Sequence, residues 1–326
     1  MLTSKYIKKY FYFTFILAIL IYFYLCNFNI HRIPLNFYSF HNKPLMKAEI
    51  EGVKYSLLVD TGSSNDLGIH EKKINKIFKK QFLDTKSLMD LKGDVYSVKR
   101  FLVPSASIGN LSIKKVTIQE ETSSFFENAG LLWTDSLNPV SHNKKYECID
   151  GSIGRSIFFD WVSFFNFRDQ VIFLTTNINE MKKNCNINQF ISVPLIINKY
   201  GINITLETDF GMKRFILDTG ANLSVLQESQ ITKENAKEIF PGRWQCITNQ
   251  LKTESHDFGN WPFWLYEFCP EAEFDGILGV DFFKKHLIIF DFQNQTAYIC
   301  DKPFKDIASY SFRIREFISK LINHAI

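Results

Sequence analysis

The feature that most constrains the fold of this chain is a tripeptide, Asp-Thr-Gly, that occurs twice, at residues 60–62 and 218–220. Each copy follows an apolar run that is typical of a strand, residues 55–59 before the first and 213–217 before the second. A single copy would mean little, because Asp and Gly are common turn residues. Two copies at the ends of matching strands predict one site that is built from both.

The duplication continues downstream of both tripeptides. Asp-Gly-Ser-Ile-Gly at residues 150–154 matches Asp-Gly-Ile-Leu-Gly at 275–279, an offset of 125 (275 minus 150). At the same offset, residues 164–170 match 289–295, so each half is predicted to end in a strand, a polar turn and a strand. The pattern indicates an internal repeat of a whole lobe.

With these motifs the chain resembles the pepsin-like aspartic proteases, in which two lobes each contribute an Asp-Thr-Gly and a later hydrophobic-hydrophobic-Gly element. The resemblance covers about residues 44–302. It implies an all-β fold with minor helices, a bilobal acid protease fold with the active site between two related β lobes. We expect the lobes at residues 44–176 and 193–302, with a linker at 177–192.

The resemblance implies that Asp60 and Asp218 are the catalytic residues. Two carboxyl groups about 3 Å apart cannot both ionise at modest cost, so the pair shares one proton, and aspartic proteases are the standard example of this behaviour. The ionised Asp takes a proton from water while the other donates to the peptide carbonyl, which hydrolyses the peptide without a covalent intermediate.

Five neighbouring residues are expected to support the pair. Gly62 and Gly220 allow a close approach of the backbone that a side chain would block. By resemblance, Thr61 and Thr219 point their hydroxyl groups into the opposite loop and tie the two acids together. The fifth residue, Ser63, is expected to hydrogen-bond Asp60.

Ser63 has no counterpart in the second half, because Ala221 cannot make the same bond to Asp218. Ser63 would bind the outer oxygen of Asp60 and bias which acid stays ionised. We therefore expect an asymmetric pair and an acidic to mildly acidic pH optimum.

A hairpin is predicted at residues 88–103, where the resembling enzymes fold a flap over the substrate. The turn contains Gly93, and the nearest tyrosine is Tyr96, three residues later, whereas the family commonly has a tyrosine just before the flap glycine. Tyr96 is thus either a flap residue or one more packed tyrosine. Before the flap, helical spacing predicts a surface helix at 71–83. After it, residues 120–146 are expected to form an irregular insertion that shapes substrate pockets or covers the lobe.

The N-terminal segment is predicted to cross a membrane. Residues 10–30 carry no charged side chain, which is long enough for a bilayer core of about 30 Å, and no cleavage signature follows. Residues 1–32 are therefore interpreted as a cytoplasmic stub and an uncleaved signal anchor, and residues 33–43 as a tether. Lysines at positions 5, 8 and 9 favour a cytoplasmic N-terminus and periplasmic or lumenal lobes, although basic residues beyond the span leave a flipped anchor open.

The C-terminal segment, residues 303–326, has the pattern of an amphipathic helix that docks on a lobe or lies on the membrane surface. Six cysteines include Cys26 in the predicted span. If the lobes are outside the cytoplasm, Cys246 and Cys269 would form a disulfide within the second lobe. Buried thiols in a reducing compartment are the alternative.

Other chemistries find little support. The seven histidines show no metal-binding spacing, no glycine loop suited to phosphate is present, and a net charge of +4 without a basic run does not indicate nucleic-acid binding. We expect no metal and no cofactor. One chain carries both motifs, so the catalytic unit should be a monomer acting on polypeptide. The leading hypothesis is a membrane-anchored aspartic endopeptidase, and the alternative is a catalytically silent lobe pair that binds peptides or a partner.

Overall fold

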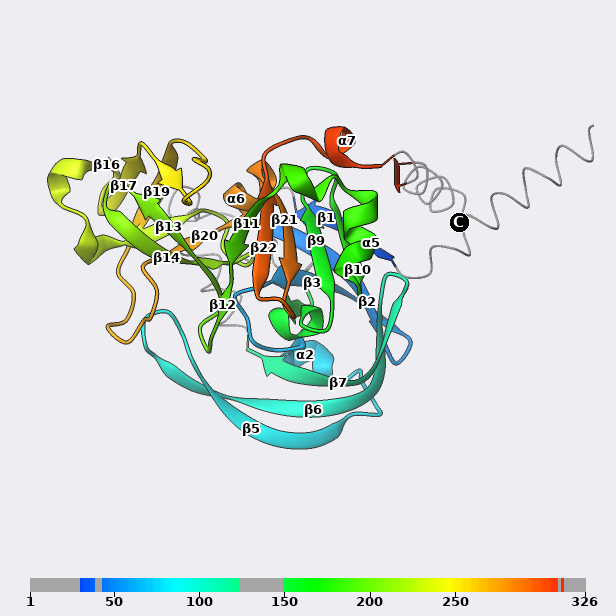
Figure 1. Cartoon of the computed structure of the whole chain (residues 1–326). Coiled ribbons are helices and arrows are strands. Elements are labelled where there is room, and N and C mark those ends of the chain that lie inside the picture. The colour runs from blue at the N-terminus through cyan, green and yellow to red at the C-terminus, as the bar shows by residue number, and fades with distance from the viewer. Residues whose placement is uncertain (1–29, 39–42, 123–148, 310–311, 314–326) are drawn as a thin grey trace, which may run out of the picture.

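The computed structural model describes residues 30–38, 43–122, 149–309 and 312–313 (Figure 1). The predicted membrane span, nearly all of the 120–146 insertion and most of the C-terminal amphipathic helix lie outside these residues. Within them, no helix has both the length and the apolar character needed to cross a membrane.

The described chain is built mainly from strands, which form two sheets of thirteen and nine strands. The first repeat contributes β2 (Lys43–Ile50), β3 (Val53–Asp60), β4 (Leu67–His70), β5 (Gln81–Met89), β6 (Val95–Ile108), β7 (Leu111–Glu121) and β8 (Gly151–Gly154). The second sheet contains β12 (Ile196–Ile197), β13 (Ile202–Thr208), β14 (Gly211–Leu217), β15 (Val225–Gln227), β16 (Ala236–Phe240), β17 (Arg243–Thr248), β18 (Leu251–Lys252), β19 (Trp261–Tyr266) and β20 (Gly276–Leu278).

Six further strands of the larger sheet join the two halves of the chain (Figure 1). They are β1 (His31–Tyr38), β9 (Val162–Asn166), β10 (Val171–Thr175), β11 (Ile191–Pro194), β21 (Leu287–Asp291) and β22 (Thr296–Cys300). The short helices are α2 (Glu71–Ile74), α5 (Ile178–Asn184), α6 (Val280–Lys285) and α7 (Phe304–Ile307), with 3-10 turns η3 (Arg155–Phe158), η4 (Ile187–Gln189), η5 (Glu228–Gln230) and η6 (Lys233–Asn235).

The internal repeat is confirmed down to single hydrogen bonds. Strands β3 and β8 pair in parallel, as do their counterparts β14 and β20. Asp150 Oδ2 accepts the main-chain N–H of Ser56 at 2.7 Å, and its counterpart Asp275 Oδ2 accepts that of Arg214 at 2.7 Å. The two halves therefore share the same parallel strand pairing and the same bond from a main-chain N–H to an aspartate.

The strands at the ends of the two repeats pair with each other. In the antiparallel pair of β9 and β21, Phe164 lies opposite Ile289, its own counterpart in the repeat (289 minus 164 is 125). An approximate two-fold axis therefore passes between these strands. Symmetry of this kind brings the two Asp-Thr-Gly turns together.

Two sequence-based predictions are wrong. Residues 33–38 of the expected tether instead belong to strand β1, which pairs with β10 and β2 and buries Ile33 and Leu35 at alternate positions. The helix predicted at 71–83 ends at Ile74, because the chain turns into β5 and leaves Phe78 90% exposed. The segment 177–192, expected as a linker, contains α5, η4 and the start of β11.

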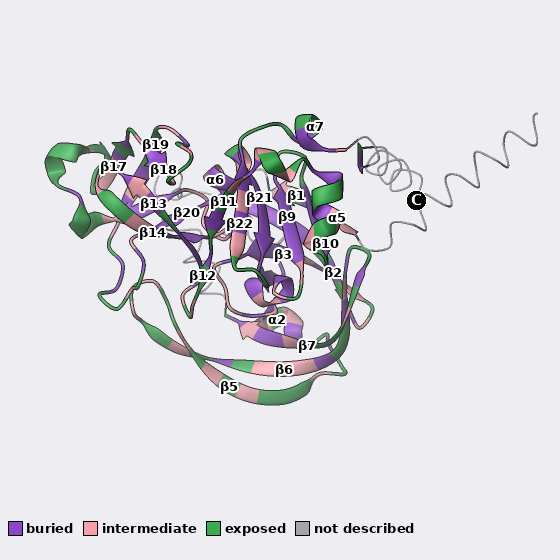
Figure 2. Cartoon of the chain, viewed as in Figure 1, coloured by how far each residue is buried: buried purple, intermediate pink, exposed green. Residues whose placement is uncertain are grey.

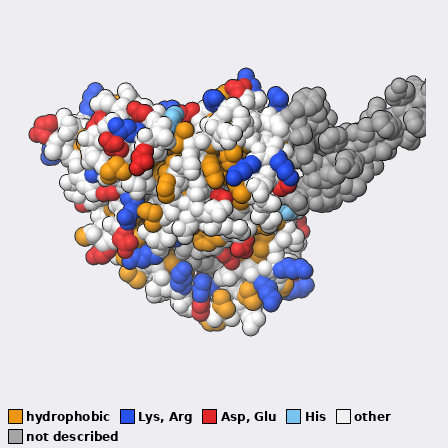
Figure 3. All heavy atoms as spheres, in the orientation of Figure 1, with side chains coloured by type: hydrophobic (Ala, Val, Ile, Leu, Met, Phe, Trp, Pro, Cys, Tyr) orange, Lys and Arg blue, Asp and Glu red, His pale blue; other side chains and the backbone are white. Residues whose placement is uncertain are grey.

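Buried residues concentrate in the strands that join the halves, whereas much of β5 is exposed (Figure 2). On the face in Figure 3, basic and acidic side chains are interspersed over both lobes. The ring of Phe165 on β9 makes edge contacts with Phe158, Phe283 and Phe290. These contacts link the first lobe to α6 and β21 of the second repeat.

We expect Phe165→Ala to destabilise the protein strongly, because the side chain is fully buried at this junction. Removing a buried phenylalanine ring costs about 3–5 kcal/mol through lost burial and the cavity it leaves. Phe78→Ala is the control, since Phe78 is exposed and its loss should change the free energy by less than about 0.5 kcal/mol. Denaturant unfolding measures both, and equal effects would contradict the assigned core.

Candidate active site

The structure places the two Asp-Thr-Gly turns face to face. Asp60 is the last residue of β3, and Asp218 directly follows β14. Thr61 Oγ1 donates to the carbonyl of Leu217 at 2.8 Å and accepts the N–H of Thr219 at 3.0 Å. Thr219 Oγ1 makes the same two bonds, to the carbonyl of Val59 at 2.7 Å and from the N–H of Thr61 at 3.1 Å.

These four crossed bonds lie between fully buried threonines, where they are shielded from water. The glycines are required because each turn approaches the opposite carboxyl group. A Cβ atom on Gly62 would lie 2.6 Å from Cγ of Asp218, and one on Gly220 would lie 2.5 Å from Oδ1 of Asp60. Any side chain at either position would push the carboxyl groups apart.

The environment of the pair is asymmetric and favours a proton on Asp60. Burial raises the pKa of Asp60 well above its usual range, and the charge of Asp218 and a hydrogen bond with it raise this pKa further. Lys43 and the N–H of Ser63 oppose the rise. The N–H groups of Gly62 and Gly220 donate to Oδ1 of Asp218 at 3.1 and 2.7 Å.

The contact that the structure gives between Ser63 and Asp60 comes from the main-chain N–H, at 3.0 Å, rather than from the side-chain hydroxyl. This bond lowers the pKa of Asp60, but burial and the neighbouring carboxylate outweigh it, so the net shift is upward.

Two buried cations beside the pair were not found from the sequence. Lys43 Nζ donates to the carbonyl of Gly220 at 3.4 Å, and Arg155 donates to the carbonyl of Gly62 at 2.5 Å. Burial lowers the pKa of each, and both Asp60 and Asp218 oppose that shift. The repeat held a signal for Arg155, since its counterpart is the apolar Val280 (155 plus 125). No sequence pattern marks Lys43.

The expected hairpin is formed by β5 and β6, which curve under the first lobe so that the tip reaches the second (Figure 1). Gly93 is in the turn, with φ +93°. Leu91 packs against the buried cluster around Phe268, and its carbonyl accepts the N–H of Cys269 at 2.9 Å. The flap tip is therefore docked on the second lobe.

Tyr96 lies on β6, three residues beyond Gly93, and is half-buried. Burial raises the pKa of its phenol, and the negative charges of Glu121, Asp90 and Asp60 raise it further. Tyr96 is thus close enough to Asp60 for their charges to interact. Tyr96 therefore lies on the returning strand of the hairpin rather than in its turn.

The described cysteines are all buried free thiols: Cys185, Cys246, Cys269 and Cys300. The expected disulfide between Cys246 and Cys269 is absent from the structure. Cys246 packs in the main core on β17, and burial raises the pKa of its thiol to about 11. Cys269 instead lies in the loop after β19, where a Cβ on Gly93 of the flap would be 3.2 Å away.

A buried polar cluster contacts the first active-site loop through Asn65. Asn65 Nδ2 donates to Glu121 Oε1 and to Ser152 Oγ, both at 3.2 Å, and Ser152 Oγ donates to Glu121 Oε1 at 2.5 Å. Burial raises the pKa of Glu121 to about 7, and the bonds from Ser152 and Asn65 only partly offset this. Sequence reasoning did not single out this glutamate.

We expect Glu121 to make stability depend on pH. Its folded-state pKa of about 7 exceeds the ordinary 4.5, so the folded protein holds the proton more tightly than the unfolded chain. Its contribution is complete below pH 4.5 and is lost as the pH rises through 7. The loss is roughly 3 kcal/mol, because one pKa unit corresponds to about 1.4 kcal/mol.

Glu121→Gln should remove this dependence and stabilise the protein at neutral pH, as measured by denaturant unfolding at several pH values. Glu120→Gln is the matched control, because the neighbouring side chain is partly exposed and faces Lys99 at 3.5 Å. A Glu121→Gln protein that keeps the wild-type pH dependence would contradict the assignment.

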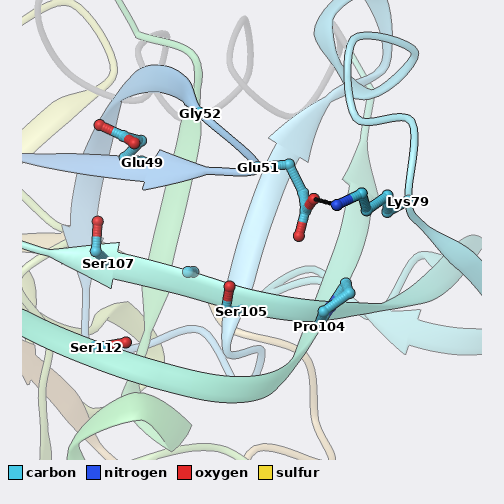
Figure 4. A pocket seen from close by; sticks show the side chains of 9 residues that line it. Glu49, Glu51, Gly52, Lys79, Pro104, Ser105, Ser107 and Ser112 are labelled. Carbon is cyan, nitrogen blue, oxygen red and sulfur yellow. Dashed lines mark ion pairs between the residues drawn. The ribbon is translucent and has the colours of Figure 1, made fainter.

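A separate surface hollow lies at the β2–β3 turn, at the opposite end of β3 from Asp60 (Figure 4). It contains an ion pair between Glu51 and Lys79 at 3.5 Å. Its other lining residues are Glu49, Gly52, Pro104, Ser105, Ala106, Ser107 and Ser112. Within the described residues, no three His, Cys, Asp or Glu side chains gather in a way that could hold a metal ion.

Solved structures with a similar fold include the following two. The aspartic proteinase from Irpex lacteus matches with a TM-score of 0.55 and 13% identity, over 84% of this chain and 98% of its own. Basic 7S globulin from soybean matches with a TM-score of 0.52 and 11% identity, over 85% and 96%. No family model and no curated protein matches the sequence. The chain thus has a mostly β, two-sheet architecture that matches the bilobal pepsin-like fold.

Proposed function

We propose that this protein is an aspartic endopeptidase whose catalytic residues are Asp60 and Asp218. The fold alone does not decide this, because it is shared by an aspartic proteinase and by basic 7S globulin from soybean. The observation that carries the proposal is the set of four crossed threonine bonds, which holds the two Asp-Thr-Gly turns together so that the carboxyl groups of Asp60 and Asp218 interact directly. A pair that served only packing would not need two acids in contact.

In the proposed reaction, Asp218 accepts a proton from a water molecule whose oxygen attacks the peptide carbonyl carbon. Asp60 donates its proton to the carbonyl oxygen, giving a tetrahedral diol. Collapse of the diol breaks the C–N bond as Asp218 passes the proton it took from water to the leaving nitrogen, while a hydroxyl of the diol returns a proton to Asp60, so the pair again holds one proton. No bond forms between enzyme and substrate.

Asp60→Asn and Asp218→Asn should each reduce peptide cleavage by at least about 10³-fold, because each removes one partner of the proton transfer. The measurement is hydrolysis of a mixed peptide library, read by mass spectrometry at acidic and neutral pH. Asp209→Asn is the control, since Asp209 is exposed and bonds Asn249 at the surface. Wild-type protein that is folded and cleaves nothing would sink the proposal.

That outcome would leave the alternative, a catalytically silent protein that binds peptides or a partner through its cleft. The docked flap tip is the observation that favours this alternative, because Leu91 packs against an apolar cluster of the second lobe. Peptide binding that persists in Asp218→Asn without cleavage in the wild type would identify this case.

We also propose that residues 10–30 anchor the protein in a membrane with the lobes outside the cytoplasm. The support is the uncharged run and the lysines that precede it. Strand β1 begins at His31, so the fold follows the proposed span without a spacer.

Fractionation of cells that express the full chain tests the anchor. We expect the protein in membranes after carbonate extraction, and a chain that lacks residues 1–29 in the soluble fraction. An added protease should digest the lobes only from the side opposite the N-terminus. Full-length protein that is released by carbonate would contradict the anchor, and lobes digested from the N-terminal side would indicate the flipped orientation.

A further inference from the structure

Two buried cations of the first repeat lie beside the carboxyl pair. Lys43 begins β2, and Arg155 follows β8 at the start of η3. Each is only 3% exposed, and each donates to the carbonyl oxygen of one active-site glycine. Burial of a charged group is costly unless opposite charge or hydrogen bonds compensate it.

We propose that Lys43 and Arg155 are positioning residues that favour ionisation of the Asp60–Asp218 pair, and so move the pH range in which the pair holds one proton to lower pH. This inference rests on the proposed function, because it assigns that range to catalysis. It also concerns a property of the two carboxyl groups that can be measured without any substrate.

The physical basis is the sign and burial of the charges. Both Asp60 and Asp218 interact electrostatically with each cation, and a positive charge beside a carboxyl group favours its ionised form. Solvent does not screen such charges effectively in a buried site. Among the described residues, Tyr96 of the flap also interacts electrostatically with Asp60, and its phenol is neutral at acidic pH.

Arg155 has a second role that Lys43 lacks. Its guanidinium group donates to Gly62 in the first lobe and to the carbonyl of Lys199 in the second, at 2.9 Å. A planar guanidinium can make both contacts at once, whereas a lysine ammonium cannot reproduce that geometry. Arg155 therefore also fixes the first catalytic loop relative to the second lobe.

The decisive experiment compares Lys43→Met with Lys43→Arg in the full chain. We expect both limbs of the pH profile of kcat/KM to move upward by about one pH unit in Lys43→Met, and to stay in place in Lys43→Arg. A lysine that served packing alone would change the rate at all pH values and leave the limbs unmoved. That result, in a folded Lys43→Met protein, would overturn the proposal for Lys43.

Arg155→Lys and Arg155→Gln form the second comparison. Loss of the charge in Arg155→Gln should move the limbs upward as in Lys43→Met. Arg155→Lys should leave the limbs of the pH profile in place but lower kcat. It keeps the positive charge and loses the simultaneous contact with Gly62 and Lys199. If both variants have the wild-type profile, Arg155 has no part in setting it.

A substrate-free titration separates this proposal from the proposed function. The ¹³Cγ resonance of Asp60, assigned by its loss in Asp60→Asn, should titrate about one pH unit higher in Lys43→Met than in the wild type. If the protein cleaves no peptide, the proposed function fails while this titration still tests the cations. An unchanged titration in folded Lys43→Met would refute their role whatever the activity.

Discussion

The structure depends on four hydrogen bonds in which Thr61 and Thr219 each bind the opposite Asp-Thr-Gly segment of the chain. They are buried, so breaking any one would leave an unsatisfied donor or acceptor away from water, at a cost of about 1–3 kcal/mol. Because each threonine bonds the loop of the opposite repeat, neither Asp-Thr-Gly turn can move without the other. Two lobes with a common fold thereby act as one site.

The charges around the pair follow from this geometry. Two carboxyl groups held close together cannot both ionise at modest cost. Burial of Asp60 and the charge of Asp218 raise the pKa of Asp60, whereas two main-chain N–H groups converge on Asp218. Lys43 and Arg155 supply positive charge that a pair of buried acids would otherwise lack. The site therefore places two carboxyl groups beside two buried cations.

The sequence predicts the parts of this arrangement that the repeat presents twice. It does not predict the parts that depend on contacts between distant segments. Asp60 and Asp218 are visible because a repeat presents each residue type twice in the same local context. Strand β1 was missed because its alternating pattern is short and lies beside a long apolar run. Lys43 was missed because its partner, Gly220, lies 177 residues away and only the tertiary fold brings them together. Local pattern finds turns and strands, but it does not show which side chains converge from distant elements.

Neutron diffraction from crystals grown at mildly acidic pH tests the central claim most directly, because it locates the shared hydrogen itself. The account predicts the carboxyl groups of Asp60 and Asp218 within hydrogen-bonding distance, with a single deuterium on Asp60 and none on Asp218. Carboxyl groups that lie apart, or that both carry or both lack deuterium, would contradict it.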